Sequence, residues 1–171
     1  MTRPDISTVP DFYKAYVDYV KDMDLHEALR HAGKLVQELL PTIPEEKGSY
    51  RYGVGKWTIK EVLNHIMDAE RVFAYRALRF SRNDQTPLHP FEENDYAIQA
   101  NANSRTLQQL GKEMQHLRDS TIDLYASFSP EMLQREGTAS NKRISVLNLG
   151  YIIAGHDIHH RKVLIERYLK P

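Results

Sequence analysis

Two histidines stand four residues apart near the end of the chain, in the stretch GHDIHHRKVLIERYL. With about 100° of rotation per residue, His156 and His160 fall on one face of a helix, within its apolar stripe. Side chains at this spacing lie about 6 Å apart, so both imidazoles can bind one metal ion at about 2.0–2.1 Å. The spacing indicates a helical metal site, although inward histidines also occur as hydrogen-bonded core residues.

A third candidate ligand, His65, lies in KEVLNHIMDAER, on the flank of another predicted apolar stripe. Three neutral imidazoles leave a fourth coordination position for water or substrate, which is typical of catalytic rather than structural zinc sites. A divalent ion in such a site lowers the pKa of bound water toward about 7 and can deprotonate a bound thiol. We therefore expect His65, His156 and His160 to hold an ion that is open to a substrate.

Other ionisable residues are weaker candidates for a catalytic role. His159 falls about 60° from His156, where it either hydrogen-bonds a substrate or lies at the surface. Glu92, Glu93 and Asp95 would reach the metal only if the segment that carries them folds across the site. No serine triad or glycine-rich phosphate loop is present, so any catalysis is expected to depend on the metal.

Several charged residues near the candidate ligands have structural interpretations. Asp157 is expected on the inward side of its helix, where it either orients a ligand or pairs with Arg71 or Arg76. Asp68 and Glu70 are expected to be surface partners of basic residues rather than general bases. The remaining histidines fall in polar faces or in a proline-rich stretch and are predicted to be solvated: His26, His31, His89 and His116.

Composition argues against several classes of protein. The 23 basic and 23 acidic residues balance without a dense basic cluster, so nucleic acid is not an expected partner. The chain has no cysteine, which excludes a protein thiolate as metal ligand or nucleophile. It has no apolar run of membrane-spanning length and no signal-peptide pattern at its N-terminus, so we expect a cytoplasmic protein without a membrane partner. Its 171 residues suit one domain, spanning 1–171.

The candidate site residues fall in helices, because apolar residues recur at steps of three and four. Four long helices are predicted, at residues 25–39, 58–82, 104–128 and 145–169, with a shorter helix before them carrying Phe12, Tyr16, Tyr19 and Val20. Thr58 and Glu61 have capping-box spacing at the start of the second, and Ser129-Pro130 is expected to cap a short turn over 131–134. The spacing contains no strand pattern. These features predict an all-α fold, an antiparallel four-helix bundle.

The segment 83–103 is long for a connection between bundle helices, and it contains PLHPFEENDY. Such long connections are often functional.

Three segments together resemble the DinB/YfiT-like superfamily: GKWTIKEVLNHIMDAERVFAYRAL, PFEENDY and IIAGHDIHHRKVLIERYL. The likeness extends from about residue 24 to the C-terminus. The superfamily pattern of one histidine on the second helix and H-x-x-x-H on the fourth falls on His65, His156 and His160. The resemblance implies a four-helix bundle that holds a divalent ion, commonly zinc or nickel, often in a homodimer.

The resemblance leaves three functions open. Some members of the superfamily are S-transferases or an isomerase that use a low-molecular-weight thiol, and we favour activation of such a thiol as cosubstrate for transfer to a small-molecule electrophile. The first alternative is a metal-dependent hydrolase that uses bound water, for which His159 and a loop carboxylate are the candidate general bases, neither of them placed by a motif. The second is a helical bundle that binds metal without catalysis. An exposed apolar strip on the short N-terminal helix would serve a homodimer or cover the bundle.

Overall fold

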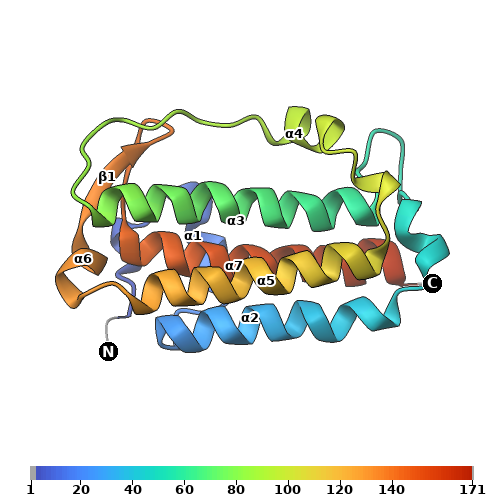
Figure 1. The fold of residues 1–171 in the computed structure, drawn as a ribbon, viewed down its shortest axis with the longest axis horizontal. Coiled ribbons are helices and arrows are strands. Elements are labelled where there is room, and N and C mark those ends of the chain that lie inside the picture. Colours follow the sequence, from blue (N-terminus) through green and yellow to red (C-terminus); the bar gives the residue numbers. More distant parts are fainter. Residues whose placement is uncertain (1–2, 171) are drawn as a thin grey trace.

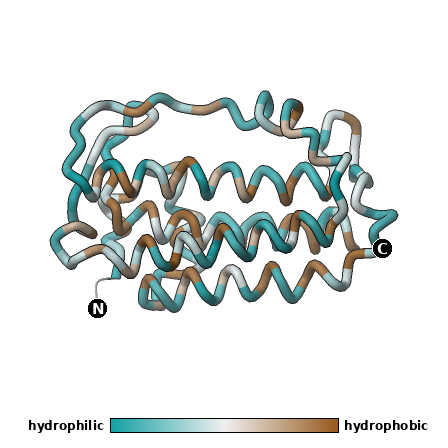
Figure 2. Tube along the Cα trace, in the orientation of Figure 1, coloured by the Kyte–Doolittle hydropathy of each residue, from teal (hydrophilic) through white to brown (hydrophobic). Residues whose placement is uncertain are grey.

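The computed structural model describes residues 3–170 and is built from four long helices that lie side by side (Figure 1). They are α2 (Leu25–Leu39), α3 (Ile59–Ser81), α5 (Leu107–Ala126) and α7 (Val146–Val163), the last of which continues as a π-helical segment, Leu164–Leu169. Apolar residues recur along each helix and are separated by polar ones (Figure 2). The predicted helical bundle is therefore confirmed.

The long connection between α3 and α5 decides the direction of the helices. It returns along the length of α3 and carries a short helix, α4 (Glu93–Gln99), so α5 runs in the same direction as α3 (Figure 1). Successive helices α2 and α3, and likewise α5 and α7, run in opposite directions. A connection without helix was expected here, so α4, whose N-terminus is capped by the Glu92 side chain, was not predicted.

Smaller elements complete the fold. They are α1 (Asp11–Val17), α6 (Pro130–Gln134) and an antiparallel hairpin of β1 (Glu136–Ala139) and β2 (Lys142–Ser145). Of these, α6 and the hairpin lie at one end of the bundle (Figure 1). The expectation of a chain without strands was wrong at this hairpin. Its strands are too short to show a clear alternation of apolar and polar residues, and its turn residues Ser140 and Asn141 both have positive φ, as a tight hairpin turn requires.

Helix starts follow local capping signals. Thr58 and Glu61 form the predicted capping box of α3, Ser129 caps α6, and Ser145 caps α7. The third long helix begins at Leu107, later than predicted, because Thr106 and Gln109 form a second capping box there.

Helix α1 packs directly on α7. A Cβ atom at Gly155 would lie 2.0 Å from the Tyr16 carbonyl oxygen, so only glycine permits this approach of the two backbones. The contact brings the aromatic side chains of α1 next to the histidines of α7.

Candidate metal centre

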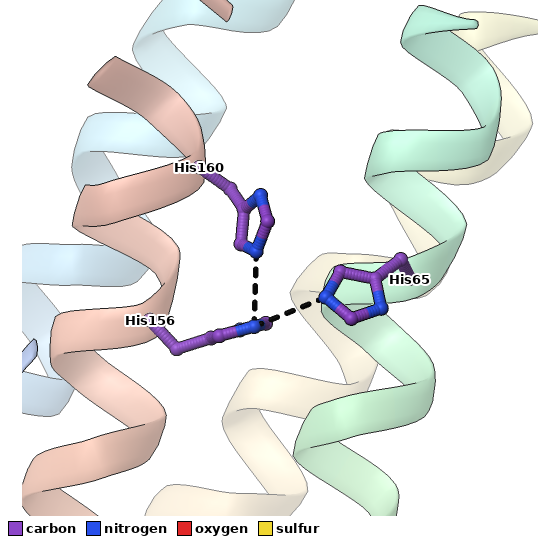
Figure 3. A group of neighbouring side chains, drawn as sticks. All are labelled: His65, His156 and His160. Carbon is purple, nitrogen blue, oxygen red and sulfur yellow. Dashed lines mark hydrogen bonds between the residues drawn. The ribbon is translucent and has the colours of Figure 1, made fainter. Parts of the chain in front are cut away.

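The three predicted ligands converge between two neighbouring helices. His65 comes from α3, and His156 and His160 lie one turn apart on α7, with their rings turned toward one another (Figure 3). The Nε2 atom of His156 lies 3.1 Å from that of His65 and 3.0 Å from that of His160. His65 and His156 are buried, with 4% and 6% of their surface exposed, and His160 is half-buried.

These nitrogens fit a shared cation. Ligands at about 2.0–2.1 Å in tetrahedral geometry lie about 3.3 Å from each other, close to the observed separations. Direct hydrogen bonding satisfies the trio less well, because His156 Nε2 faces two nitrogens and a neutral ring nitrogen either donates or accepts. One divalent ion would use all three lone pairs, and imidazole donors suit ions such as zinc and nickel.

Burial keeps these imidazoles in the form that binds metal. Desolvation lowers the pKa of His65 to about 4. It also lowers the pKa of His156 and His160 well below the ordinary value, with a further contribution from the neighbouring histidines. All three rings are therefore neutral at pH 7, so that no proton has to be displaced for an ion to bind.

His159 contacts this group without sharing its ligand spacing, with its ring centre 5.1 Å from that of His160. Its ring is half-buried and contacts that of Tyr16, with the ring centres 5.0 Å apart. Tyr16 also contacts His156 edge-on, at 5.4 Å. His159 thus belongs to the aromatic surroundings of the site, while His65, His156 and His160 form the cluster with ligand spacing.

The predicted loop carboxylates Glu92 and Glu93 differ in their relation to the cluster. Glu93 Oε2 lies 4.0 Å from His65 Nε2, and burial followed by the charge of Glu92 raises the pKa of Glu93. Glu92 itself caps α4 and is exposed. The returning connection therefore brings one carboxylate, that of Glu93, next to a candidate ligand.

A pocket of about 270 Å³ opens beside the cluster. His65 and His156 form part of its wall together with Glu92 and Glu93, and the aromatic side chains come from α1, α3 and the long connection: Phe12, Tyr13, Tyr16, Phe73 and Phe91. A small molecule in this pocket would therefore meet both the histidines and a carboxylate while its apolar part packs on aromatic rings.

Asp157 has a different partner from the two that were predicted. Its Oδ2 accepts a hydrogen bond of 2.7 Å from Arg118 Nη2, so the expected pairing with Arg71 or Arg76 was wrong. Glu70 is not a surface residue as expected, because it is 4% exposed and accepts two hydrogen bonds of 2.9 Å from the same guanidinium.

The predicted surface role does hold for Asp68, which pairs with Arg71 at the edge of the bundle. The other four histidines are exposed or half-buried and lie outside the metal cluster, as predicted: His26, His31, His89 and His116.

The buried ionic cluster of Glu70, Arg118 and Asp157 was missed, although the sequence carries a signal for it. Arg118 follows Met114 by four residues and precedes Thr121 by three, so it falls on the apolar stripe of α5. A charged residue at such a core-facing position needs a buried partner, and this requirement could have indicated the cluster. Burial raises the pKa of the Asp157 carboxyl, against the attraction of Arg118.

The amino-acid sequence matches the model of a known family. The DinB superfamily model matches residues 28–164. The chain belongs to the DinB superfamily. A relative of the chain is a putative metal-dependent hydrolase of Oceanobacillus iheyensis. The two are 26% identical over 142 residues, which are 80% of this chain and 81% of the relative.

Two solved structures share the fold of this DinB superfamily member. YfiT from Bacillus subtilis, a probable metal-dependent hydrolase with an unusual four-helix bundle topology, aligns with a TM-score of 0.70 at 16% identity, over 96% of this chain and 90% of YfiT. A mycothiol-dependent maleylpyruvate isomerase aligns with a TM-score of 0.67 at 13% identity, over 94% of this chain and 62% of the isomerase. At these identities the likeness concerns the fold.

No helix in residues 3–170 is both long and apolar enough to cross a membrane.

Proposed function

We propose that this protein is a metal-dependent hydrolase of a small molecule, in which His65, His156 and His160 hold one divalent ion, zinc or nickel. When bound, such an ion acts as a Lewis acid that lowers the pKa of a coordinated water toward about 7. The observation that carries the proposal is Glu93 Oε2 at 4.0 Å from His65 Nε2, because it favours Glu93 over His159 and Glu92 as the general base.

Glu93 would take the proton of the attacking water and return it to the leaving group. A carboxylate next to the ligand set suits this role, because it can accept one proton and release it again. The aromatic wall of the pocket would hold the apolar part of the substrate and exclude bulk water.

A metal assay with a carboxylate variant tests this proposal. Protein purified without chelator should contain about one divalent ion per chain by elemental analysis. Glu93→Gln should keep the ion and lower kcat/KM for p-nitrophenyl esters by about 100-fold or more. Asp95→Asn is the matched control, since Asp95 is exposed on the same helix and lines a different groove. Equal activity of the Glu93→Gln and Asp95→Asn variants would contradict the role of Glu93.

Thiol transfer is the second candidate, and it was favoured from the sequence. It is supported by the fold shared with a mycothiol-dependent isomerase and by the lack of any cysteine that would compete for the ion. In this reaction Glu93 would accept the proton of the incoming thiol. Nickel-loaded protein should then gain a sulfur-to-metal absorption band when glutathione, bacillithiol or mycothiol is added. If the protein binds metal but shows neither this absorption band nor ester hydrolysis, the result would favour a helical bundle that binds metal without catalysis.

Assembly and location remain predictions. On α1 and just after it, Phe12 and Tyr19 are exposed, so a second copy of the chain is a candidate partner for this surface. Sedimentation velocity of the full chain would measure its oligomeric state. The single-domain organisation and the cytoplasmic location also stay predictions.

A further inference from the structure

The pocket beside the histidines contains a buried arginine that the proposed function does not use. Arg76 is 3% exposed and lies on α3, on the same wall of the pocket as His65. Its Nη2 donates to the His89 carbonyl oxygen at 3.0 Å and to the Ser140 hydroxyl at 3.1 Å. Both partners are neutral.

No carboxylate oxygen in residues 3–170 lies within 4.0 Å of the Arg76 guanidinium. The contrast with Arg118 is direct, because that equally buried guanidinium is bound by the carboxylates of both Glu70 and Asp157. A buried cation without a counter-charge is costly. Although burial lowers the pKa of Arg76, an arginine side chain keeps its proton in proteins. The pocket wall therefore carries a positive charge that no acidic side chain neutralises by contact.

The positions of Arg76 and His65 along α3 give the pocket two different ends. The two residues are eleven positions apart, which corresponds to about 16 Å along the helix axis. They point from nearly the same face of α3, with a difference of about 20° around the axis. Ala69 and Phe73 lie between them on the same wall. One end of the pocket thus holds histidines and the Glu93 carboxylate, and the other holds a guanidinium, with an apolar and aromatic stretch between them.

We propose that this pocket binds a small aromatic carboxylate, with its oxyanion on Arg76 and its reactive group toward His65 and His156. The inference rests on the proposed function, because it names the class of substrate for the same site. Since Nη2 already donates to His89 and Ser140, a carboxylate would accept hydrogen bonds from the other N–H groups of the guanidinium, and the rings of Phe73 and Phe91 would pack against the substrate's apolar body. The volume of about 270 Å³ suits a small ligand, since it lies just below the usual range of about 300–1,000 Å³.

Isothermal titration of the full chain with benzoate and with benzamide tests the anion site. The two probes have similar size and differ in charge. Benzoate should bind at least about 10-fold more tightly than benzamide, and the preference should persist in chelator-treated protein, because it depends on Arg76 and not on an ion. This comparison keeps the failure of the anion site separate from failure of metal binding, which elemental analysis measures independently.

Arg76→Gln should abolish the preference for benzoate without changing the metal content. Arg79→Gln is the matched control, since Arg79 lies one turn later on α3 and pairs with Asp84 and Tyr75 at the surface. Equal binding of benzoate and benzamide by the unmodified protein would overturn the proposal, whether or not the Arg76→Gln variant folds. An unchanged preference in folded Arg76→Gln would also overturn it. Tighter binding of phenyl phosphate than of benzoate would overturn the assignment to carboxylates.

Discussion

At the scale of single residues, the candidate centre depends on which ring nitrogens share one point in space. Only His160 of the adjacent pair His159 and His160 directs Nε2 toward His156, at 3.0 Å. The chain also has a single tryptophan, Trp57, whose ring centre lies 4.7 Å from that of His65. Its fluorescence should therefore report directly on an ion in this centre.

His160→Ala should abolish stoichiometric binding of a divalent ion, while His159→Ala should retain it, because only the first removes a converging nitrogen. Helical content should stay nearly unchanged in both, since the helices are held mainly by apolar packing. Quenching of Trp57 by Ni²⁺, together with elemental analysis, measures the difference. Full metal content in the His160→Ala variant would refute the proposed ligand set, and loss of metal in the His159→Ala variant would show that the wrong neighbour had been chosen.

At the scale of elements, one side chain connects all four long helices. Arg118 of α5 donates to the Leu29 carbonyl of α2, to Glu70 of α3 and to Asp157 of α7. This ionic cluster lies between two apolar clusters, which contain opposite ends of the same helices. Because Asp157 follows His156 directly, the contact also holds α7, and with it two candidate ligands, in position against α3.

Arg118→Met should lower the free energy of unfolding by about 3 kcal/mol or more, because it leaves two buried carboxylates without their cation. Arg71→Met is the matched control. Arg71 is exposed and pairs with Glu113 and Asp68, so its loss should cost less than about 1 kcal/mol. Urea unfolding followed by circular dichroism would compare the two. Equal destabilisation by the two substitutions would mean that the buried cluster contributes no more to the free energy of unfolding than a surface ion pair does.

At the scale of the whole molecule, α7 is tied to the segment that precedes α2. The buried Tyr151 hydroxyl donates to the Met23 carbonyl oxygen at 2.9 Å. Burial, followed by the charge of Asp24, raises the pKa of Tyr151 to about 12. Since an unfolded tyrosine has a pKa of about 10, the folded state holds this proton more tightly. The resulting stability is complete below about pH 10 and is lost as pH rises through about 12.

Tyr151→Phe should therefore destabilise the protein by about 1 kcal/mol at pH 8, where the hydrogen bond is intact. The difference from the unmodified protein should shrink as pH rises from about 10 to 12, because phenylalanine cannot ionise. Urea unfolding at a series of pH values measures this difference. Stability curves that stay parallel across that range would show that Tyr151 does not control the alkaline loss of stability.

Most of the helices, and the spacing of two ligands, could be predicted from the sequence because both depend on neighbouring residues. Capping by Thr58 and Ser145 involves residues three positions away, and His156 and His160 share a helix face through the helical period alone. The short hairpin and α4 were not predicted, since strands of four residues and a helix of seven carry little periodic signal.

The sequence by itself thus determined the four long helices and the ligand-like spacing on α7, through interactions within one or two turns. Only the tertiary structure decided which distant residues meet: Glu93 with His65, Arg118 with Glu70 and Asp157, and Arg76 with neutral partners alone. These contacts depend on how whole helices pack and on the path of the connection after α3. The helices pack because apolar surface is buried, and this driving force is not directional. The residues next to a charged side chain in the sequence therefore do not specify which distant residue it will contact.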